Sequence, residues 1–436
     1  MNKTLVALVG MGTVGTGVAR LLLDHGDRTA RHAGRTLWVQ HIVVRNAAKI
    51  RDADMPTGAI TTDLQRLLDD DQVKVVAQLI GGLEPARTIM LKLLESGKDV
   101  VTANKALLAH HGPELFDRAR ELGRTIAFEA SVAGGIPIIA NISQCLAANQ
   151  IQSLQAILNG TSNFIITNMQ EKGMRYKDAV AQAQELGFAE ADPTMDVDGT
   201  DAAQKLAILA HLAFGARVNW SEIPRRGIDT IQTIDLQYAN EMGYSLKLLA
   251  VARLSGGGLE LHVSPTLIPK GMPLAEVRQN FNAISVEGDA VGPVFFHGQG
   301  AGQMPTASAV VADLIDVAVG RAAITFRNLK LWSKQPPRVD VSDHDQSESK
   351  FYFRFDVLDQ PGVLAQIAAV LGFHRISIAS VHQYDRDKNH ETGTVPLVIV
   401  THMAAEKNAR QALSEIQCLP VVKNSGERLK IIGSMS

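Results

Sequence analysis

The stretch Thr4-Leu5-Val6-Ala7-Leu8-Val9-Gly10-Met11-Gly12-Thr13-Val14-Gly15 decides the fold of the N-terminal third. Residues 4–9 predict a buried strand, and residues 14–23 predict a helix. Between them lies G-x-G-x-x-G, in which the first glycine allows a tight turn, the second lets a pyrophosphate approach, and the third lets helix and strand pack. The pattern predicts dinucleotide binding at the helix start, against the alternative of a purely structural glycine turn. The residues expected to contact the cofactor are Gly10, Gly12, Thr13, Val14 and Gly15.

Strands and helices continue to alternate through residue 129. Strands are predicted at 37–44, 73–80, 99–102 and 125–129, helices at 84–95 and 113–122, and a polar loop at 24–35. This alternation predicts an α/β fold with a Rossmann-type, doubly wound parallel sheet. We assign residues 1–130 to an NAD(P)-binding domain.

Two cations follow predicted strands of this sheet. Arg45 stands where NAD enzymes usually carry an acid for the ribose hydroxyls. A cation there suits the 2′-phosphate of NADP, so NADP is favoured over NAD; a solvated loop position is the alternative. Lys105, in Thr102-Ala103-Asn104-Lys105, is expected at a carboxyl strand end, where ligands bind, and the alternative is a surface lysine.

Residues 190–205, Glu-Ala-Asp-Pro-Thr-Met-Asp-Val-Asp-Gly-Thr-Asp-Ala-Ala-Gln-Lys, combine carboxylates with one lysine. Asp201 and Lys205 are four apart and share one face at the start of an apolar helix. A lysine held among carboxylates suits proton transfer. A solvated acidic loop is one alternative. A calcium loop is another, although the closing glutamate of an EF-hand is absent.

The middle of the chain changes in texture. Small residues at 130–137 allow backbone carbonyls to turn toward a ligand or a hard cation. Strands are predicted at 155–158, 259–265 and 283–291. We assign residues 131–303 to an α+β domain for substrate binding, catalysis and dimerisation. The glycine-rich residues 298–302 precede a helix at 304–320, which is expected to pack back on the first domain; a flexible hinge is the alternative for the glycines.

The C-terminal part is predicted to be a separate domain. Pro336-Pro337 and polar residues indicate a linker at 330–349. Strands are predicted at 350–357, 376–384, 395–401 and 429–432, and helices at 364–371 and 406–416. The order βαββαβ is ferredoxin-like, and we assign it residues 350–436.

Composition excludes several classes of function. The 436 residues are 46% hydrophobic and 20% charged, which is typical of a globular protein of two to four domains. A net charge of −2 gives no basic excess for nucleic acid or an anionic membrane. No segment approaches a membrane span. Cys145 and Cys418 predict neither a disulfide framework nor a zinc site, and fit a reducing cytoplasm.

The order of these motifs resembles the monofunctional homoserine dehydrogenases that carry a C-terminal ACT regulatory domain. The matching pieces are Gly-Met-Gly-Thr-Val-Gly, Thr-Ala-Asn-Lys, Glu-Ala-Ser-Val-Ala-Gly-Gly-Ile-Pro, Asn-Gly-Thr-Ser-Asn-Phe-Ile, the run 198–205, Gly-Ala-Gly with Pro-Thr-Ala-Ser-Ala, and Asp-Gln-Pro-Gly-Val-Leu at 359–364. The set in this order is specific, whereas any one piece is not. The monofunctional form is expected because no kinase-like segment precedes residue 1.

The resemblance implies an oxidoreductase that interconverts L-aspartate 4-semialdehyde and L-homoserine with NAD(P), in the biosynthesis of threonine, methionine and isoleucine. It implies that Lys205 moves the proton at the alcohol oxygen, with Lys105 as its active-site partner close to the cofactor. Glu190 and Asp201 match substrate-binding residues. Gly187 and Gly302 match cofactor contacts.

The resemblance also implies a cation and an effector. The residues that match a monovalent-cation site, expected to hold sodium mainly through backbone oxygens, are Glu129, Val132, Gly134 and Ile136. L-threonine is expected to bind near the turn at 359–364 and to lower activity. The residues expected there are Asp359, Pro361, Gly362, Val363 and Leu364.

Because ACT modules generally pair side by side, a homodimer or homotetramer is expected. Two rival functions stay open. One is another NAD(P)-dependent semialdehyde or hydroxy-acid dehydrogenase, and the other is a non-catalytic amino-acid sensor.

Overall fold

The computed structural model describes residues 3–51, 53, 55–332, 336–383, 393–424 and 426–432. They form two compact units, each built from several stretches of chain. The first contains Met1–Leu154, Ala203–Ile223 and Phe281–Asp340, and the second contains Gln155–Ala202, Pro224–Asn280 and Val341–Ser436. These units cut across the boundaries expected at 130, 303 and 350, which stay predictions.

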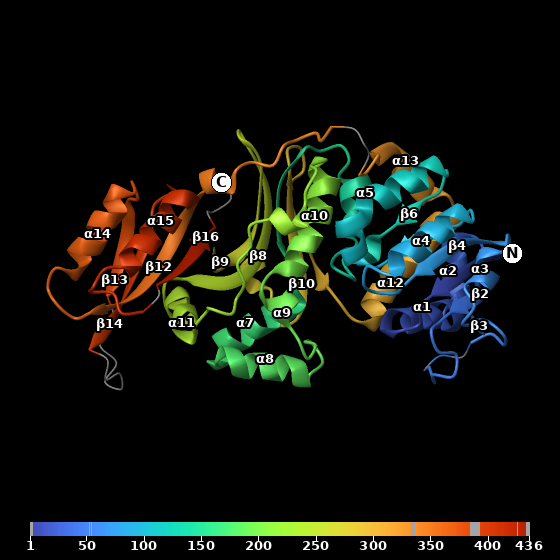
Figure 1. The fold of residues 1–436 in the computed structure, drawn as a ribbon, viewed down its shortest axis with the longest axis horizontal. Coiled ribbons are helices and arrows are strands. Elements are labelled where there is room, and N and C mark those ends of the chain that lie inside the picture. The colour runs from blue at the N-terminus through green and yellow to red at the C-terminus, as the bar shows by residue number, and fades with distance from the viewer. Residues whose placement is uncertain are drawn as a thin grey trace. The chain divides into compact units, whose positions relative to one another are not determined.

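A six-stranded sheet dominates the first unit (Figure 1). Its strands are β1 (Lys3–Val9), β2 (Thr36–Val43), β3 (Ile60–Thr61), β4 (Val73–Gln78), β5 (Asp99–Thr102) and β6 (Ile126–Ala127). Their order is β3-β2-β1-β4-β5-β6 and every pair is parallel. This is the order of a doubly wound dinucleotide-binding sheet, so the predicted fold class is confirmed.

Helices cover this sheet. They are α1 (Thr13–Asp24), α2 (Gly26–Ala33), α3 (Gln65–Leu68), α4 (Ala86–Glu95), α5 (Lys105–Glu121), α12 (Gln303–Ala318) and α13 (Arg321–Leu329). Ala307, Val310 and Leu314 of α12 share one buried core with Val6 of β1 and Val18 of α1. The late helix α12 is therefore part of the core of the nucleotide-type sheet. The unit also holds α6 (Ile138–Ala140), a π-helix at Asn141–Cys145, and the antiparallel hairpin β10 (Phe281–Gly288) and β11 (Gly292–Gln299).

Two local predictions in this unit were wrong. Residues 24–35 do not form a loop, because α2 buries Thr29, Ala30 and Ala33 on one face and ends at Gly34 with φ +65°. The helix expected at 113–122 begins earlier, at Lys105, because the Asn104 side chain caps it. Proline is common in a first helical turn, but Pro113 lies inside α5.

The second unit contains a mixed sheet with the order β8-β9-β16-β12-β14-β13. These strands are β8 (Tyr244–Ser255), β9 (Gly258–Pro269), β12 (Glu348–Leu358), β13 (Ile378–Gln383), β14 (Thr394–Thr401) and β16 (Glu427–Ile431), and β15 (Ala404–Ala405) pairs with β12. The helices are α7 (Gly160–Lys172), α8 (Tyr176–Glu185), α9 (Thr194–Val197), α11 (Thr233–Glu241), α14 (Val363–Phe373) and α15 (Glu406–Gln417). Two elements, β7 (Ile151–Ile157) and α10 (Thr200–Phe214), begin in one unit and end in the other.

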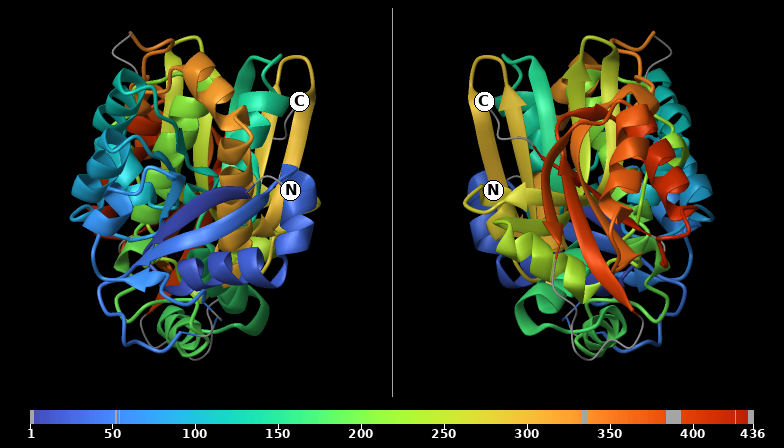
Figure 2. Two further views of the ribbon diagram at one scale, coloured as in Figure 1. Left: turned by 90° about the vertical axis from the view of Figure 1, so that its right-hand side faces the viewer. Right: turned by 90° about the vertical axis from the view of Figure 1, so that its left-hand side faces the viewer.

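The C-terminal βαββαβ order is present as predicted, with Tyr384 outside the described residues. Strand β12 alternates, so Phe351, Phe353 and Phe355 pack against α14 and α15, which lie together on one face of these strands (Figure 2). The last strand of the βαββαβ segment, β16, pairs in parallel with β9, with Lys430 opposite Thr266. The C-terminal segment thus continues the sheet of the second unit. No helix among the described residues combines the length and the apolar character needed to cross a membrane.

Candidate active site

The glycine turn after β1 has the geometry that a dinucleotide requires. Gly10 has φ +99°, and a Cβ on Gly15 would lie 2.4 Å from the carbonyl oxygen of Gly10. At Gly12, by contrast, no described atom lies within 4 Å of where a Cβ would be. Helix α1 begins at Thr13 with no acid in its first turn, so its N-terminus favours an anion. The first and third glycines are therefore needed for packing, and the second keeps the approach open.

Arg45 lies next to this turn through the neighbouring strand. The amide of Gly10 donates to the carbonyl of Val43 at 2.9 Å, and Arg45 follows two residues later as an exposed side chain. Gly302 precedes α12 with φ +126°, and α12 packs so closely on α1 that a Cβ on Gly17 would lie 2.9 Å from Ala307 Cβ. The cofactor contacts expected of Val14, Arg45 and Gly302 stay predictions.

Lys105 is the first residue of α5, and Asn104 fixes that helix start. The Asn104 side-chain oxygen accepts from the Leu107 amide at 3.0 Å. Its Nδ2 donates to the carbonyls of Ile80 (3.1 Å) and Gly82 (2.7 Å) in the turn after β4. One amide thereby joins the start of α5 to the bare turn at the carboxyl edge of the sheet, where ligands bind in this fold.

The acidic run at 190–205 is a structured turn with two kinds of carboxylate. Asp192 and Asp198 act locally, because they accept hydrogen bonds from Thr194 and Thr200 at the starts of α9 and α10. Asp196 and Asp201 are instead gathered by Asn159, whose Nδ2 donates to Asp196 Oδ1 at 2.7 Å and Asp201 Oδ2 at 2.9 Å. These side-chain hydrogen bonds join elements that are distant in sequence, so they favour an organised site over a solvated acidic loop.

Asn159 is itself held in place. Its side-chain oxygen accepts from the Ser162 amide at 2.7 Å and caps α7. Asn159 is 4% exposed and Asp201 6%, so burial and hydrogen bonding fix the direction of the Asp201 carboxylate. Asp201 lies in the first turn of α10, and Lys205 follows one turn later on the same helix as a partly exposed side chain.

Glu190 and Gly187 lie in the connection after α8. Glu190 is exposed, and its carbonyl accepts from Gln184 Nε2 at 3.1 Å. Gly187 has φ +74°, and the Phe188 amide bonds back to the Ala183 carbonyl at 2.8 Å, which is how a helix ends in a Schellman motif. Gly187 therefore has a backbone reason to be glycine. Glu190, Gly187 and Asp201 belong to the second unit, and Lys105, Lys205 and Gly302 belong to the first.

The loop expected to hold sodium has a constrained backbone. Ala133 has φ +55°, a conformation that costs on the order of 1 kcal/mol or more for a non-glycine residue. A Cβ on the next residue, Gly134, would lie 2.5 Å from the Gly300 carbonyl oxygen. The Ile136 amide closes the loop onto the Ala133 carbonyl at 2.9 Å. Val132 and Ile136 are buried in the same loop.

The Glu129 carboxylate is engaged by the backbone that follows this loop. It accepts from the amides of Ile139 (2.9 Å) and Ala140 (2.8 Å) at the start of α6. Burial raises the pKa of Glu129 to about 7, and burial with the neighbouring Glu129 raises the pKa of Asp313, which accepts from the Glu129 amide at 2.8 Å. Since both carboxylate oxygens serve α6, a cation in this loop would be held mainly by backbone carbonyls.

The turn at 359–364 begins α14. Gly362 has φ +87°, and the residues of the turn from Asp359 to Gly362 are exposed, whereas Val363 points into the core. Leu364 is 41% exposed. With no acid in its first turn, the helix start presents amide groups that suit a carboxylate.

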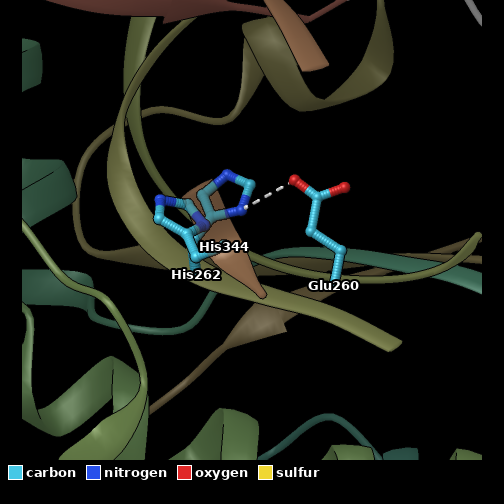
Figure 3. Close-up of side chains that lie close together, drawn as sticks. All are labelled: Glu260, His262 and His344. Atoms are coloured by element: carbon cyan, nitrogen blue, oxygen red, sulfur yellow. Dashed lines mark ion pairs between the residues drawn. The ribbon is translucent and has the colours of Figure 1, made fainter. Parts of the chain in front are cut away.

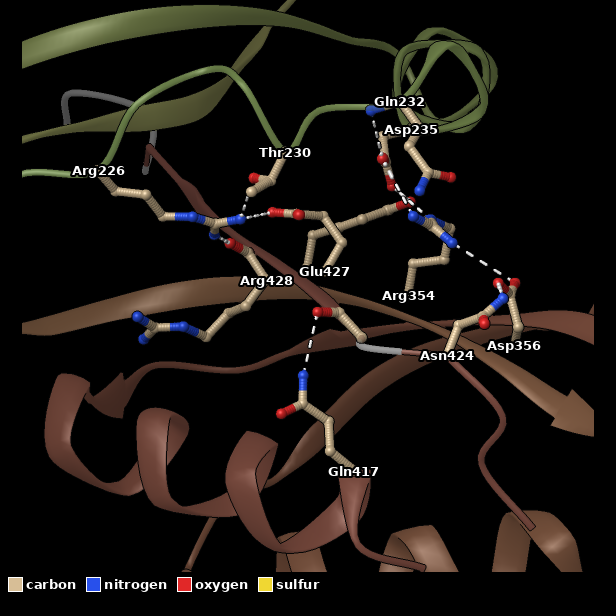
Figure 4. A network of polar contacts seen from close by, with 12 residues as sticks. Arg226, Thr230, Gln232, Asp235, Arg354, Asp356, Gln417, Asn424, Glu427 and Arg428 are labelled. Carbon is tan, nitrogen blue, oxygen red and sulfur yellow. Dashed lines mark hydrogen bonds and ion pairs between the residues drawn. The ribbon is translucent and has the colours of Figure 1, made fainter. Parts of the chain in front are cut away.

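Ion pairs fasten the C-terminal segment to the rest of the second unit (Figure 4). Asp235 on α11 is 0% exposed and takes two hydrogen bonds from Arg354 on β12, at 2.6 and 3.3 Å. Tyr352 donates a third from its hydroxyl at 3.2 Å. Arg226 also pairs with Glu427 and donates to the carbonyl of Arg428 on β16. The face of β12 opposite its phenylalanines is therefore polar and paired.

Sequence reasoning missed Asn104, Asn159, Asp196 and the Asp235–Arg354 pair as contributors. A signal existed for the two asparagines, since each stands immediately before a helix, where a capping side chain is expected. The Asp235–Arg354 pair joins residues that are far apart in the chain, so no local sequence pattern predicts it.

Comparison with known proteins agrees with this geometry. The family models described as homoserine dehydrogenase, NAD-binding domain, and homoserine dehydrogenase match residues 10–129 and 137–315, and the ACT domain matches residues 351–419. A homoserine dehydrogenase of Pseudomonas aeruginosa is 42% identical, with 99% of each chain covered. The crystal structure of one from Thiobacillus denitrificans superposes with a TM-score of 0.90 at 40% identity, covering 99% of each chain.

A more distant hyperthermophilic archaeal homoserine dehydrogenase, described in complex with NADPH, has a TM-score of 0.60 at 26% identity. It covers 73% of this chain, and 98% of its own chain is matched. The matches to the two bacterial relatives span the nucleotide-type sheet, the acidic turn and the C-terminal segment in one order. The chain therefore belongs to the homoserine dehydrogenase family.

Proposed function

We propose that this chain catalyses the NADP-dependent interconversion of L-homoserine and L-aspartate 4-semialdehyde. The observation that carries the proposal is the 42% identity to a homoserine dehydrogenase over nearly the whole of both chains. The nicotinamide, when bound, supplies the acceptor or donor of hydride. The glycine turn fits a dinucleotide because Gly12 leaves open space beside the start of α1.

Lys205 and Lys105 handle charge at the reacting oxygen. In the oxidation of L-homoserine, Lys205 takes the hydroxyl proton as the C–O bond becomes a carbonyl, and in the reverse direction it returns that proton to the aldehyde oxygen. Lys105, at the carboxyl edge of the sheet, stabilises the negative charge that builds on the same oxygen. Support comes from the placement of Lys205 one turn after the buried Asp201.

Asp201 and Glu190 bind the ammonium group of the amino acid. Asn159 holds Asp201 through its Nδ2, so the carboxylate is oriented before substrate arrives. Glu190 is exposed and complements it from the connection after α8. This carboxylate pair favours an amino-acid substrate over a simple hydroxy acid.

NADP is the preferred cofactor. Arg45 follows the strand beside the glycine turn and carries the charge that a 2′-phosphate needs. The archaeal relative described in complex with NADPH supports the same choice. A sodium ion is held by the loop at 129–136, through carbonyl oxygens rather than the Glu129 carboxylate, which bonds to α6.

L-threonine binds at the turn at 359–364 and lowers activity, and the chain acts as a homodimer or homotetramer. The exposed turn, the αL conformation of Gly362 and the ACT match at 351–419 support an amino-acid effector. The effector's carboxylate would meet the first amides of α14.

The test is a nicotinamide absorbance assay with L-homoserine and NADP. Lys205→Ala should lower kcat by about a hundred-fold or more while NADP still binds, as followed by cofactor fluorescence. Lys172→Ala, at an exposed lysine at the end of α7, is the matched control and should leave kcat unchanged. Near wild-type kcat in Lys205→Ala would remove Lys205 from the reaction.

The same assay separates the rival functions. Turnover of other hydroxy acids but not of L-homoserine would identify a different dehydrogenase. Binding of NADP and L-homoserine without any turnover would identify a sensor.

A further inference from the structure

Three side chains with metal-binding groups meet in the second unit, and the proposed reaction uses none of them (Figure 3). Glu260 and His262 come from β9, and His344 comes from the 3₁₀ helix His344–Gln346 that precedes β12. Each residue offers one ligand atom, and these atoms lie within 4.8 Å of one another. The cluster is therefore compact enough for a single ion.

Backbone structure brings the three together. Residues 260 and 262 are two apart on a strand, so their side chains share one face of β9. The chain before His344 is bonded to the same strand, because the Ser342 amide donates to the Leu259 carbonyl at 3.0 Å and Val341 forms a bridge with Leu259. The position of His344 beside β9 is thus fixed by main-chain hydrogen bonds.

Each imidazole carries a nitrogen that makes no hydrogen bond within the described part of the chain. Among the residues that the structure describes, neither His262 Nδ1 nor His344 Nδ1 has a hydrogen-bond partner, although His262 is 6% exposed. A buried polar atom without a partner calls for an explanation. His262 Nδ1 lies 3.5 Å from Glu260 Oε1. Two ligands at about 2.0–2.1 Å from a tetrahedral zinc ion are about 3.4 Å apart, so the spacing suits a shared ion.

Neighbouring charges leave Glu260 available. Arg253 binds Glu260 Oε2 at 2.7 Å, which leaves Oε1 facing His262. The nearby cations Lys430 and Arg428 are both paired with Glu406, at 3.3 and 2.5 Å. Glu406 therefore offsets part of their repulsion of a metal ion; Arg225 and Arg226 also line the cavity, and Arg226 is paired with Glu427.

We propose that Glu260, His262 and His344 bind one divalent transition-metal ion of the zinc class. Two imidazole ligands exclude a hard cation such as magnesium or calcium as the preferred occupant, since those ions select oxygen ligands. Both histidines also line a cavity of about 290 Å³, from which water can complete the coordination. The ion ties the entrance of the C-terminal segment to β9.

Metal content of the full chain is the test. The protein is stripped with a chelator, loaded with zinc and dialysed, and zinc is counted per chain by atomic emission. Cobalt(II) loading gives a second readout, because a four-coordinate site with nitrogen ligands produces a visible absorption band. We expect about one ion per chain, as a single three-ligand site predicts.

Three variants locate the ion. His344→Ala, at a partly exposed position, should weaken zinc binding by more than about a hundred-fold, because even outer partners of metal ligands contribute 10–100-fold. His262→Gln should do the same and keeps a side chain of similar size in the buried position. His382→Ala on β13 is the matched control and should bind zinc as the wild-type chain does. Wild-type protein that retains no zinc, or equal retention in His344→Ala, would overturn the proposal.

Discussion

Arg45 is one residue on which cofactor choice can be tested. It is exposed and follows the strand whose Val43 carbonyl accepts from the Gly10 amide. Arg45→Glu places a negative charge where the 2′-phosphate is expected, so KM for NADP should rise at least about ten-fold more than KM for NAD, from loss of a charge-assisted contact. Arg31→Glu, on the exposed face of α2, is the control: it makes the same change of charge away from the glycine turn and should leave both KM values unchanged. Equal effects of Arg45→Glu on both cofactors would place Arg45 away from the 2′ position.

His211 on α10 works as a neutral hydrogen-bonding residue. Its Nδ1 bonds to the Ala216 carbonyl at 2.7 Å, so its Nε2 is left to accept from the Trp332 amide at 2.5 Å. The His211 and Trp332 rings stack, with 4.6 Å between their centroids and an interplanar angle of 9°. Burial lowers the pKa of His211 to about 4. Protonation would cost the Trp332 hydrogen bond, because an imidazolium has no acceptor.

The lowered pKa predicts acid sensitivity of the first unit. Below pH 6.5, the pKa of histidine in the unfolded chain, the unfolded chain binds a proton at His211 that the folded protein does not bind. The contribution of His211 to the free energy of unfolding is therefore complete above pH 6.5 and decreases as the pH falls toward 4. By pH 5 the loss is about 2 kcal/mol. His211→Gln cannot titrate and should lose less stability between pH 7 and pH 5 in calorimetry. Burial and Lys430 also lower the pKa of His262 to about 4. His262 is present in both the wild-type protein and His211→Gln, so its contribution cancels when their losses of stability are compared. Equal losses in both proteins would refute the role of His211.

At the scale of elements, α5 depends on Asn104 for two separate tasks. The side-chain oxygen caps the helix, and the Nδ2 group holds the turn after β4 through the Ile80 and Gly82 carbonyls. Asn104→Asp keeps the cap but loses both donors. With a carboxylate facing two unbonded carbonyls, it should lose about 1–3 kcal/mol or more of stability. Because the turn after β4 is then no longer held, kcat/KM should also fall by about ten-fold or more.

The companion change separates the two tasks. Asn104→Ala removes the cap as well, and should lose roughly a further 1 kcal/mol in urea unfolding. If Asn104→Asp matches wild type in kcat/KM, the link to the turn does not position Lys105.

Elements with a strong local signal could be predicted from the sequence. The strand predicted at 99–102 is β5. The glycine turn after β1 is predictable because the G-x-G-x-x-G spacing between a strand and a helix is typical of few other structures. The errors fell where local rules conflict. α2 is mostly polar and shows only a narrow buried face, and α5 contains a proline that suggests a helix start. Strand β8 was missed although it is long and apolar, because such a run fits a strand or a buried helix.

For the candidate site, the sequence could predict residue types but not partners. Lys105, Asp201 and the glycines follow local patterns. The contacts that hold them, Asn104 to the turn after β4 and Asn159 to Asp201, join residues far apart in the chain. Only the folded sheet brings such pairs together, so no spacing rule could reveal them.

At the scale of the whole molecule, regulation is best tested with two glycines, one immediately before helix α14 and one inside it. Gly362→Ala forces a side chain into φ +87°, which costs about 1–2 kcal/mol and should reshape the turn. Inhibition by L-threonine should be lost while kcat without threonine stays unchanged. Gly372→Ala, near the end of α14, meets no described atom of a neighbouring element within 4 Å, and this variant should stay inhibited. Inhibition that persists in Gly362→Ala would move the effector site elsewhere.

Point substitutions are required because the C-terminal segment cannot simply be removed. A chain ending near residue 335 would lose Arg354 and Tyr352, which bond to Asp235, and would uncover the side of α11 that β12 buries. It would also expose the edge of β9 that pairs with β16. Loss of threonine response in such a chain would report unfolding as readily as regulation.

The pairing of β16 with β9 also sets an order on how the protein can be made. β16 stands between β9 and β12, so the sheet has a missing strand until residues 427–431 have left the ribosome. Strand β9 is synthesised long before, and its edge is open to other chains in the meantime. We therefore expect the second unit to complete its sheet only after its last strand is made, and we expect the open edge of β9 to be prone to aggregation until then.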